Sequence, residues 1–397
     1  MEELNNLIEI SRFYGNNKDY VIAGGGNTSY KNESFVWVKA SGTSLATINE
    51  DGFVKLDRNK LKTLSSNQYS SDPMKREAQV KNDLNACVVD NPLDLRPSVE
   101  TSLHEIFDYS FVVHTHPYLV NALVCSKDSK RQVLELFGEE TLYIPYVDPG
   151  FTLFKKVEKQ LDEYRKMFRT DPHITFLENH GVFVSANSIE EIKQIYKDIE
   201  EIIRAKLPEK LEVLPAPIGK KAKQVLPALR MLVSNGDTKI LKIRNNSLIS
   251  HFYQSQDMFR KVSLPFIPDV VVYCKSKYIY VESTGNVSEI ISRFKQHLER
   301  FEKEYGYRPK VVLIKDIGLV AVEDNDASAE IVLDIFEDSM KTSYYAEFFG
   351  GQRFLNPVQI SFIDTWEVEN YRRKISKGIG TKGLVENKIA IVTGAAQ

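Results

Sequence analysis

The sequence predicts an α/β fold, because apolar β-prone runs alternate with helical patterns over its first 206 residues. The helical segments repeat apolar residues every three to four positions, whereas the strand-like runs are short and apolar. Predicted helices cover 3–13, 73–88, 99–106, 118–125 and 188–207, and predicted strands cover 19–26, 34–41, the run that carries His114 and His116, and 174–185. Mixed elements over about 200 residues suit one α/β domain.

The balanced charge of the chain argues against nucleic acid as its main partner. Among 397 residues, 52 are Lys or Arg and 54 are Asp or Glu, and no long basic block stands out. The three cysteines lie far apart, which favours a reducing cytoplasm over a disulfide framework. The first residues lack the layout of a signal peptide, and no run approaches the roughly 18 apolar residues of a membrane span. We therefore expect a soluble, cytoplasmic protein with no membrane partner.

Three of the seven histidines are placed as a metal site. His114 and His116 stand two positions apart in a β-prone run, so their side chains face one side of the strand. His180 lies in a second apolar run, "ITFLENHGVFV", and could complete a three-histidine site. Such a site leaves one coordination position open, as a catalytic zinc requires. The plainer interpretation is that these are core or surface histidines, so the surrounding residues decide.

Two Gly-rich or Ser-rich loops and a serine provide what a phosphate pocket needs. "GGGNTS" (24–29) begins at the end of the predicted strand 19–26, and its glycines let backbone N–H groups approach an anion while residues 27–29 add neutral donors. "SGTS" at 41–44 lies at the end of the next predicted strand, and Lys39 stands two residues before it. In a third loop, Ser98 lies beside the carboxylate of Glu100. Each loop lies at a strand or helix end, where phosphates bind.

The second half of the chain is predicted to be a degenerate repeat of the first. A proline-containing stretch at 207–220 separates a first domain, 1–212, from a second, 213–355. "VVLIKDIGLVAVEDNDASAEIVLDIF" repeats the order of "ITFLENHGVFVSANSIEEIKQIYKDI": strand, Gly, strand, polar turn and amphipathic helix. The alternative is chance similarity between two strand–turn–helix units.

That alignment predicts that the second copy has lost its metal ligands. Ile317 takes the place of His180, and Gly318 matches Gly181. In "IPDVVVYCKSKYIY", Tyr273 and Lys275 stand where the first copy has its His-Thr-His pair. The second copy would then be structural, or would complete the pocket of the first.

The chain closes with "ENKIAIVTGAAQ", a strand pattern that runs into Thr-Gly. It resembles the first strand of a short-chain dehydrogenase, whose glycine-rich turn holds a dinucleotide phosphate. The later glycines and the helix are absent from this sequence. Residues 356–397 are therefore interpreted as a linker and a truncated first strand, and NAD(P) is expected only in a missing dehydrogenase part.

The motifs together resemble the class II aldolase/adducin family over about residues 1–206. The matching pieces, in the family's order, are GGGNTS (24–29), KASGTS (39–44), RPSVE (96–100), HTHP (114–117) and NHG (179–181). The resemblance implies a three-layer α/β/α domain with a central β-sheet. With the second copy and the tail, it extends to fused aldolase and short-chain-dehydrogenase proteins, which include bifunctional rhamnulose-1-phosphate aldolases.

The resemblance also implies a role for each matching residue. His114, His116 and His180 match the zinc ligands, and Glu100 matches the catalytic acid/base. The positions that match phosphate binding are Gly26, Asn27, Ser41, Gly42 and Ser98. His104, four residues after Glu100, is expected to pack or to act behind the metal site. Tyr143, Tyr146 and Asp148 are candidates for lining the pocket.

The expected function is zinc-dependent cleavage of a ketose 1-phosphate, such as rhamnulose- or fuculose-1-phosphate, to dihydroxyacetone phosphate and an aldehyde. The same scaffold hosts sugar-phosphate epimerases and a dehydratase, and Glu100 favours an aldolase because the epimerases tend to carry an Asp there. A non-catalytic, adducin-like binding module is the alternative outside the enzymes. Since the family's active site lies between subunits of a four-fold ring, we expect a homo-oligomer, either a tetramer or a dimer that imitates one.

Overall fold

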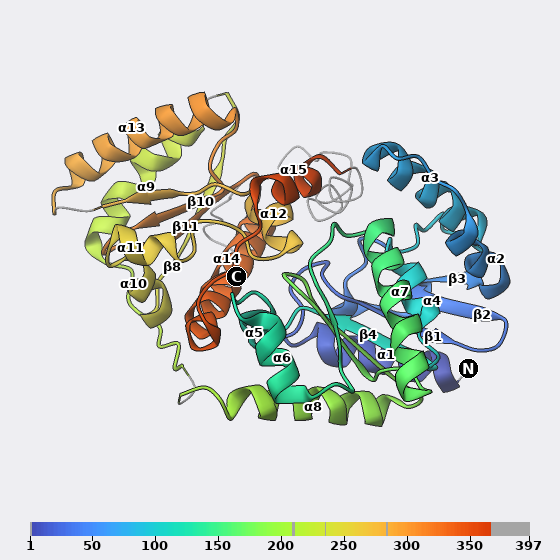
Figure 1. Cartoon of the computed structure of the whole chain (residues 1–397). Coiled ribbons are helices and arrows are strands. Elements are labelled where there is room, and N and C mark those ends of the chain that lie inside the picture. Colours follow the sequence, from blue (N-terminus) through green and yellow to red (C-terminus); the bar gives the residue numbers. More distant parts are fainter. Residues whose placement is uncertain (1, 209–210, 235, 283–284, 367–397) are drawn as a thin grey trace, which may run out of the picture.

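The computed structural model describes residues 2–208, 211–234, 236–282 and 285–366, in two sheet-containing units (Figure 1). The expected strand at 386–397 lies outside the described residues. Helices α12 (Pro268–Cys274), α14 (Asp326–Ala346) and α15 (Pro357–Thr365) lie between the two sheets. None of the helices in these ranges is both long and apolar enough to cross a bilayer.

The first unit is built on a seven-stranded sheet with the order β3-β2-β1-β4-β7-β6-β5. Neighbouring strands are antiparallel except for the parallel pair β5 and β6. The strands are β1 (Asn27–Lys31), β2 (Phe35–Lys39), β3 (Phe53–Asp57), β4 (Phe111–Thr115), β5 (Leu142–Ile144), β6 (Ile174–Leu177) and β7 (Gly181–Ala186). Residues far apart in the sequence therefore meet at the middle of the sheet.

Helices cover both faces of this sheet, which confirms the predicted three-layer α/β/α architecture. Strand β7 shows the alternation: Val182 and Val184 pack with α1, α5 and α8, whereas Phe183 packs with α4 and α7. The helices of this unit are α1 (Glu2–Gly15), α2 (Arg58–Thr63), α3 (Pro73–Ala86), α4 (Thr101–Ile106), α5 (Tyr118–Val124), α6 (Ser129–Phe137), α7 (Phe151–Phe168) and α8 (Ile189–Arg204). Short 3₁₀ turns lie at Leu45–Thr47, Glu50–Gly52 and Leu64–Ser66.

Two strand predictions were wrong in detail. Residues 19–26 form a turn, and the strand begins only at Asn27. The apolar Val21 of this segment is buried in the core, while the positive φ of Ala23 and Gly26 bends the backbone away from a strand path. The run 174–185 is a hairpin of β6 and β7, because Asn179, with φ of 54°, turns the chain between them.

The second unit contains a four-stranded sheet whose order, β8-β11-β10-β9, matches β4-β7-β6-β5 of the first. Its pairings also match in direction, antiparallel twice and then parallel. The strands are β8 (Ile240–Arg244), β9 (Ile279–Val281), β10 (Val311–Ile314) and β11 (Gly318–Glu323). Its further helices are α9 (Lys220–Val233), α10 (Ser247–Tyr253), α11 (Gln256–Arg260) and α13 (Val287–Tyr305), with a 3₁₀ turn at Glu347–Phe349.

The hairpins of the two units agree residue by residue. Leu177 pairs with Gly181, and Ile314 pairs with Gly318. Asp316, with φ of 61°, turns the second hairpin at the position of Asn179 in the first. Ile317 therefore stands where the first unit has His180.

The alignment of Tyr273 and Lys275 with the His-Thr-His pair was wrong. Tyr273 lies in helix α12, and Lys275 caps its C-terminus. Pro268 begins that helix, and the buried "VVVYC" run resembles a strand in sequence because every side chain is apolar or aromatic. The counterpart of β4 is β8, in which Ile243 lies opposite Val320.

Strand β8 places Ile243 at the position of His114, which lies opposite Phe183 in the first sheet. Two residues further on, Asn245 takes the position of His116. None of the three matched positions in the second sheet carries a metal-binding side chain of the kind found in the first.

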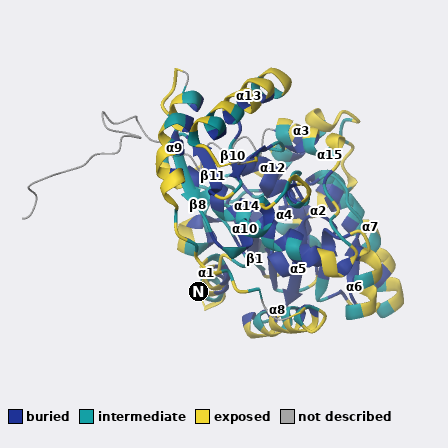
Figure 2. Ribbon diagram, turned by 90° about the vertical axis from the view of Figure 1, so that its left-hand side faces the viewer, coloured by how far each residue is buried: buried dark blue, intermediate teal, exposed yellow. Residues whose placement is uncertain are grey.

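The two units share one hydrophobic core. Helix α14 packs along α5, and the rings of Tyr118 and Tyr345 stack with centroids 5.9 Å apart. Figure 2 shows α12 and α14 within the buried region, while α13 carries an exposed outer face. Segments of the second unit can therefore reach residues at the end of β4.

Candidate active site and metal centre

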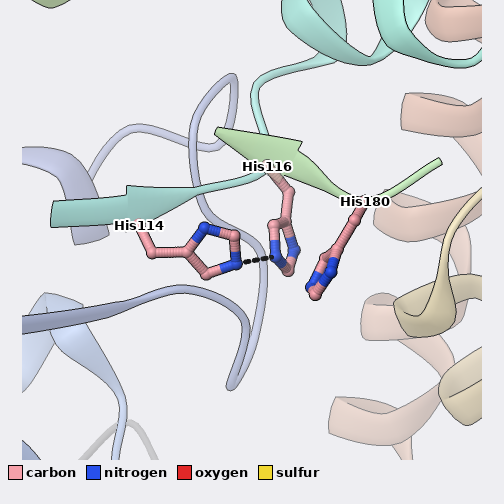
Figure 3. A group of neighbouring side chains, drawn as sticks. All are labelled: His114, His116 and His180. Atoms are coloured by element: carbon pink, nitrogen blue, oxygen red, sulfur yellow. Dashed lines mark hydrogen bonds between the residues drawn. The ribbon is translucent and has the colours of Figure 1, made fainter. Parts of the chain in front are cut away.

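The structure brings the three predicted histidines together. His114 lies in β4, His116 just past its end, and His180 in the turn between β6 and β7 (Figure 3). One ring nitrogen from each lies within 4.8 Å of the others. The antiparallel pairing of β4 with β7 causes this meeting, because Thr115 lies opposite Val182 at the same end of the sheet.

The hydrogen bonds of two rings leave the same nitrogen facing inward. His114 uses Nδ1 to donate to the carbonyl oxygen of Val182 at 2.9 Å, and His116 uses Nδ1 to donate to Oδ2 of Asp269 at 2.7 Å. Burial lowers the pKa of His114 well below its usual value, so its ring is neutral. The two Nε2 atoms lie 2.9 Å apart, within hydrogen-bonding distance of each other (Figure 3). A cation bound between the rings would replace this contact.

Glu100 completes this cluster from the start of α4. Its Oε1 atom lies 3.5 Å from Nε2 of His180 and 3.6 Å from Nε2 of His114, and it receives no hydrogen bond from the described residues. Burial raises the pKa of Glu100, whereas positive charge on the neighbouring histidines, when they are protonated, and a hydrogen bond from Asn27 lower it, and the net shift is downward. An ionised, unpartnered oxygen beside three imidazoles fits a metal site.

A chain of hydrogen bonds orients Glu100 from behind. The amide nitrogen of Asn27 donates to Oε2 of Glu100, and its amide oxygen accepts from Nε2 of His104. Nδ1 of His104 then accepts from the hydroxyl of Ser29 at 2.7 Å. Burial lowers the pKa of His104 to about 3, which keeps the ring neutral in this tautomer. His104 thus acts behind the site, without contacting the metal cluster.

The predicted phosphate residues share one cleft with this cluster. The cleft spans about 570 Å³ of space between atoms, which includes open solvent, and is lined by Gly26, Asn27, Ser41, Gly42 and Ser98 together with Glu100, His116 and His180. Lys39 also lines it, and its ammonium group donates to the carbonyl oxygens of Gly24 at 2.9 Å and Gly26 at 2.7 Å. Lys39 therefore holds the glycine loop in shape.

Two of the expected neutral donors point elsewhere. Thr28 is fully buried and its hydroxyl bonds to Ser11 at 2.7 Å, while Ser29 contacts His104. They fall on β1, whose side chains pack between the sheet and its helices. The amide of Asn27 is likewise engaged with Glu100, although the residue lines the cleft.

Sequence reasoning allowed the second copy to complete this pocket but identified none of the residues that do so. Pro268, Asp269 and Trp366 line the same cleft. The only signal for Asp269 is a single carboxylate inside the apolar run "FIPDVVVYC". Its contact with His116 depends on how α12 packs against α14 and α15, which no local pattern encodes.

Tyr143, a candidate for lining the pocket, and two further histidines lie outside the histidine cluster. Tyr143 is buried, and its hydroxyl donates to Glu178 at 2.8 Å. His173 stacks on Tyr109, and His297 bonds through Nδ1 to the carbonyl oxygen of Tyr280 at 3.0 Å. These contacts give the two histidines packing roles.

The comparisons with known proteins identify the family of the first unit. The family model for the Class II Aldolase and Adducin N-terminal domain matches residues 5–207, which is 203 of the 397 residues. The chain therefore belongs to the class II aldolase/adducin family.

One curated relative matches almost the whole chain. An uncharacterized oxidoreductase, YuxG of Bacillus subtilis (strain 168), is 26% identical over 440 residues, covering 98% of this chain and 60% of the relative. The chain thus spans about three fifths of the length of that curated relative.

Two solved structures each cover about half of the chain. One is the N-terminal class II aldolase domain of a conserved protein from Thermoplasma acidophilum, with 24% identity and a TM-score of 0.44 over 51% of this chain and 92% of that chain. The other is an L-fuculose 1-phosphate aldolase, with 17% identity and a TM-score of 0.36 over 52% of this chain and 90% of that chain.

Proposed function

We propose that this protein is a zinc-dependent aldolase that cleaves a ketose 1-phosphate to dihydroxyacetone phosphate and an aldehyde. The observation that carries the proposal is the position of Glu100. Its unpartnered Oε1 faces His114 and His180 inside a cleft rimmed by the Gly/Ser loops. A metal-binding group, an acid/base group and a phosphate pocket then meet in one place, as this reaction requires.

The three imidazoles would hold the zinc through neutral nitrogens. His114 already commits Nδ1 to a carbonyl oxygen and His116 commits Nδ1 to a carboxylate, which leaves Nε2 of both for the metal. Zinc bound by three neutral ligands keeps its double charge and would stabilise, as a Lewis acid, the negative charge that develops on breaking the carbon–carbon bond.

Glu100 would exchange the proton of the reaction. Its pKa is shifted downward, so the carboxylate is ionised at neutral pH and can accept a proton from the carbon or hydroxyl beside it. Asn27 holds Oε2 by a hydrogen bond, which directs Oε1 toward the cleft. The residue that transfers the proton is therefore fixed in orientation before substrate binds.

The Gly/Ser loops would bind the phosphate at the end of the sugar that does not react. Ser41, Gly42 and Ser98 lie on the cleft wall together with Gly26. Backbone N–H groups and hydroxyls suit a phosphate, and Lys39 keeps the glycine loop in place. Binding at this end would fix the reacting carbons beside Glu100.

We also propose that residues 213–355 are a copy of the aldolase domain without a metal site, as Ile243, Asn245 and Ile317 stand at the three ligand positions. A dimer with two units per chain could imitate the four-fold ring of the family. Light scattering at working concentration tests this, since a monomer would contradict it.

The function is tested by metal analysis and by a retro-aldol assay. Purified protein is analysed for zinc and then given rhamnulose-1-phosphate, fuculose-1-phosphate and pentulose phosphates, with separate detection of dihydroxyacetone phosphate and of epimers. We expect about one zinc per chain and dihydroxyacetone phosphate from at least one ketose 1-phosphate.

Two histidine variants distinguish the loss of the metal site from a general effect of removing a histidine. His114→Ala should abolish both zinc binding and cleavage, whereas His297→Ala, remote from the cluster, should keep both. Wild-type protein that binds no zinc, or that yields only epimers, would overturn the aldolase assignment.

A further inference from the structure

One short segment of the second unit reaches three parts of the candidate site. In residues 266–273, the carbonyl oxygen of Phe266 accepts a hydrogen bond from the amide of Asn179 at 2.9 Å, and Asp269 accepts from His116 at 2.7 Å. The hydroxyl of Tyr273 accepts from the backbone N–H of Gly24 at 3.4 Å. The turn of His180, the ring of His116 and the glycine loop are thus all contacted from the second unit.

We infer that Asp269 is a positioning residue for His116, and that the second unit, lacking ligands of its own, holds the metal site of the first in its binding geometry. The inference rests on the proposed zinc site. Asp269 acts through the imidazole, because its carboxylate bonds to Nδ1 while Nε2 faces His114.

The carboxylate determines which nitrogen of His116 is available. Because a carboxylate accepts and does not donate, it fixes a proton on Nδ1, so Nε2 is the ring nitrogen that can bind a metal. It also sets the rotation of the ring, since the bond of 2.7 Å is directional. Removing the hydrogen-bond acceptor of the ring nitrogen that does not bind the metal typically lowers metal affinity by about 10- to 100-fold.

The site is built to admit this carboxylate. Asp269 is only 6% exposed, and a Cβ at Gly25 would lie 2.8 Å from its Oδ2 atom. A side chain at position 25 would therefore displace the carboxylate from His116. The glycine loop thus makes room for α12 as well as forming one wall of the cleft.

The rings of His114 and His116 differ in where their acceptors come from. His114 donates to a backbone carbonyl of its own unit, which no side-chain substitution removes. His116 depends on a side chain 153 residues further along the chain. The geometry at His116 is therefore sensitive to the docking of the second unit, and the geometry at His114 is not.

The turn that carries His180 is anchored to the second unit as well. The amide of Asn179 donates to the carbonyl oxygen of Arg353 at 2.8 Å in addition to that of Phe266. The neighbouring Glu178 is buried and pairs with the guanidinium of Arg353 at 2.6 Å. Two of the three histidines therefore have supports that belong to residues 213–355.

The test compares Asp269→Asn with wild type in the full chain. Zinc affinity is measured by competition with a chromophoric chelator, the ligand field is read from the absorption spectrum of the cobalt(II)-substituted protein, and the melting temperature is measured without metal. We expect a 10- to 100-fold loss of zinc affinity and an altered cobalt spectrum, with the metal-free melting temperature close to that of wild type. Asp19→Asn is the matched control, because it breaks a pair of 2.7 Å with Lys341 between the units without contacting a histidine.

A second variant guards against a folding defect in Asp269→Asn. Gly25→Ala should also lower zinc affinity by displacing the carboxylate, and the double variant should lose no more than the larger single loss. Wild-type affinity in Asp269→Asn, or equal losses in Asp19→Asn, would overturn the inference and leave the zinc site intact. Failure of the proposed function looks different, because wild-type protein and His114→Ala would then bind zinc equally poorly.

Discussion

Oε1 of Glu100 lies 3.5 Å from Nε2 of His180, and no described residue donates a hydrogen bond to it. A buried carboxylate oxygen without a partner is costly, so its position needs a compensating group. The histidine cluster provides the place for a cation that would satisfy it. The same oxygen faces the cleft, where a substrate proton would be within reach.

Replacing Glu100 by Gln should separate metal binding from turnover. The amide keeps the shape of the side chain but cannot accept a proton as a base, so we expect turnover to fall by about 10²- to 10⁴-fold while zinc content stays near that of wild type. Zinc analysis and the retro-aldol assay on one preparation check this. Turnover at the wild-type rate in Glu100→Gln would remove Glu100 from the acid/base role.

Two substitutions of Asn179 separate its backbone conformation from its hydrogen bonds. Gly tolerates the φ of 54° but removes the bonds to Phe266 and Arg353, so Asn179→Gly should lower the free energy of unfolding by about 1–3 kcal/mol. Ala loses the same bonds and also strains the backbone, which should cost about 1 kcal/mol more. Urea unfolding of both variants measures the difference. An unchanged stability in Asn179→Gly would mean that these bonds do not support the turn.

Gly181 should tolerate no side chain. A Cβ there would lie 2.5 Å from the carbonyl oxygen of Thr115 and 2.8 Å from Cδ2 of His116, so Gly181→Ala must move the ring or the strand. We expect a loss of about 1–3 kcal/mol in the free energy of unfolding and weaker zinc binding. Gly219→Ala is the control, since a Cβ there meets nothing within 4 Å, and it should change stability by less than about 1 kcal/mol.

Lys31 should give the protein a distinct pH dependence of stability. Burial lowers its pKa from 10.5 to about 7, with Glu105 opposing this shift and Arg58 adding to it. Between these two pH values the unfolded chain holds a proton that the folded chain has released. The contribution of Lys31 to stability therefore rises with pH across this window, by at most about 1.4 kcal/mol per pH unit.

Urea unfolding at pH 7, 8, 9 and 10 compares wild type with Lys31→Met. We expect the stability of wild type relative to Lys31→Met to increase with pH across the series. Parallel pH profiles for the two proteins would contradict the lowered pKa of Lys31.

The central part of the site could be predicted because it follows from local rules. Side chains two apart on a strand share a face, which places His114 and His116 together, and the β6–β7 turn brings His180 to the same end of the sheet. Four residues along the chain separate Glu100 from His104, and the structure links them through Asn27. That link crosses from α4 to β1, so it depends on packing that the helix pattern does not contain.

The errors have a common origin in buried apolar segments. Residues 19–26 and the run at 270–274 both looked like strands, since apolar and β-branched side chains are typical of buried strands. The first is a turn beside the core, and the second is a buried helix begun by Pro268. Burial requires apolar side chains in any backbone conformation, so composition alone could not distinguish them.

The sequence by itself determined the fold class, the family and the residues that make up the histidine cluster, because these depend on motifs and on the periodicity of strands and helices. Tertiary structure decided which group stands behind each histidine, and it placed Asp269 of the second unit against His116. That contact joins residues 153 positions apart, and it exists only because α12 and α14 pack into the same core as the first sheet. Long-range packing of this kind depends on the whole arrangement of side chains, and no local segment of the sequence specifies it.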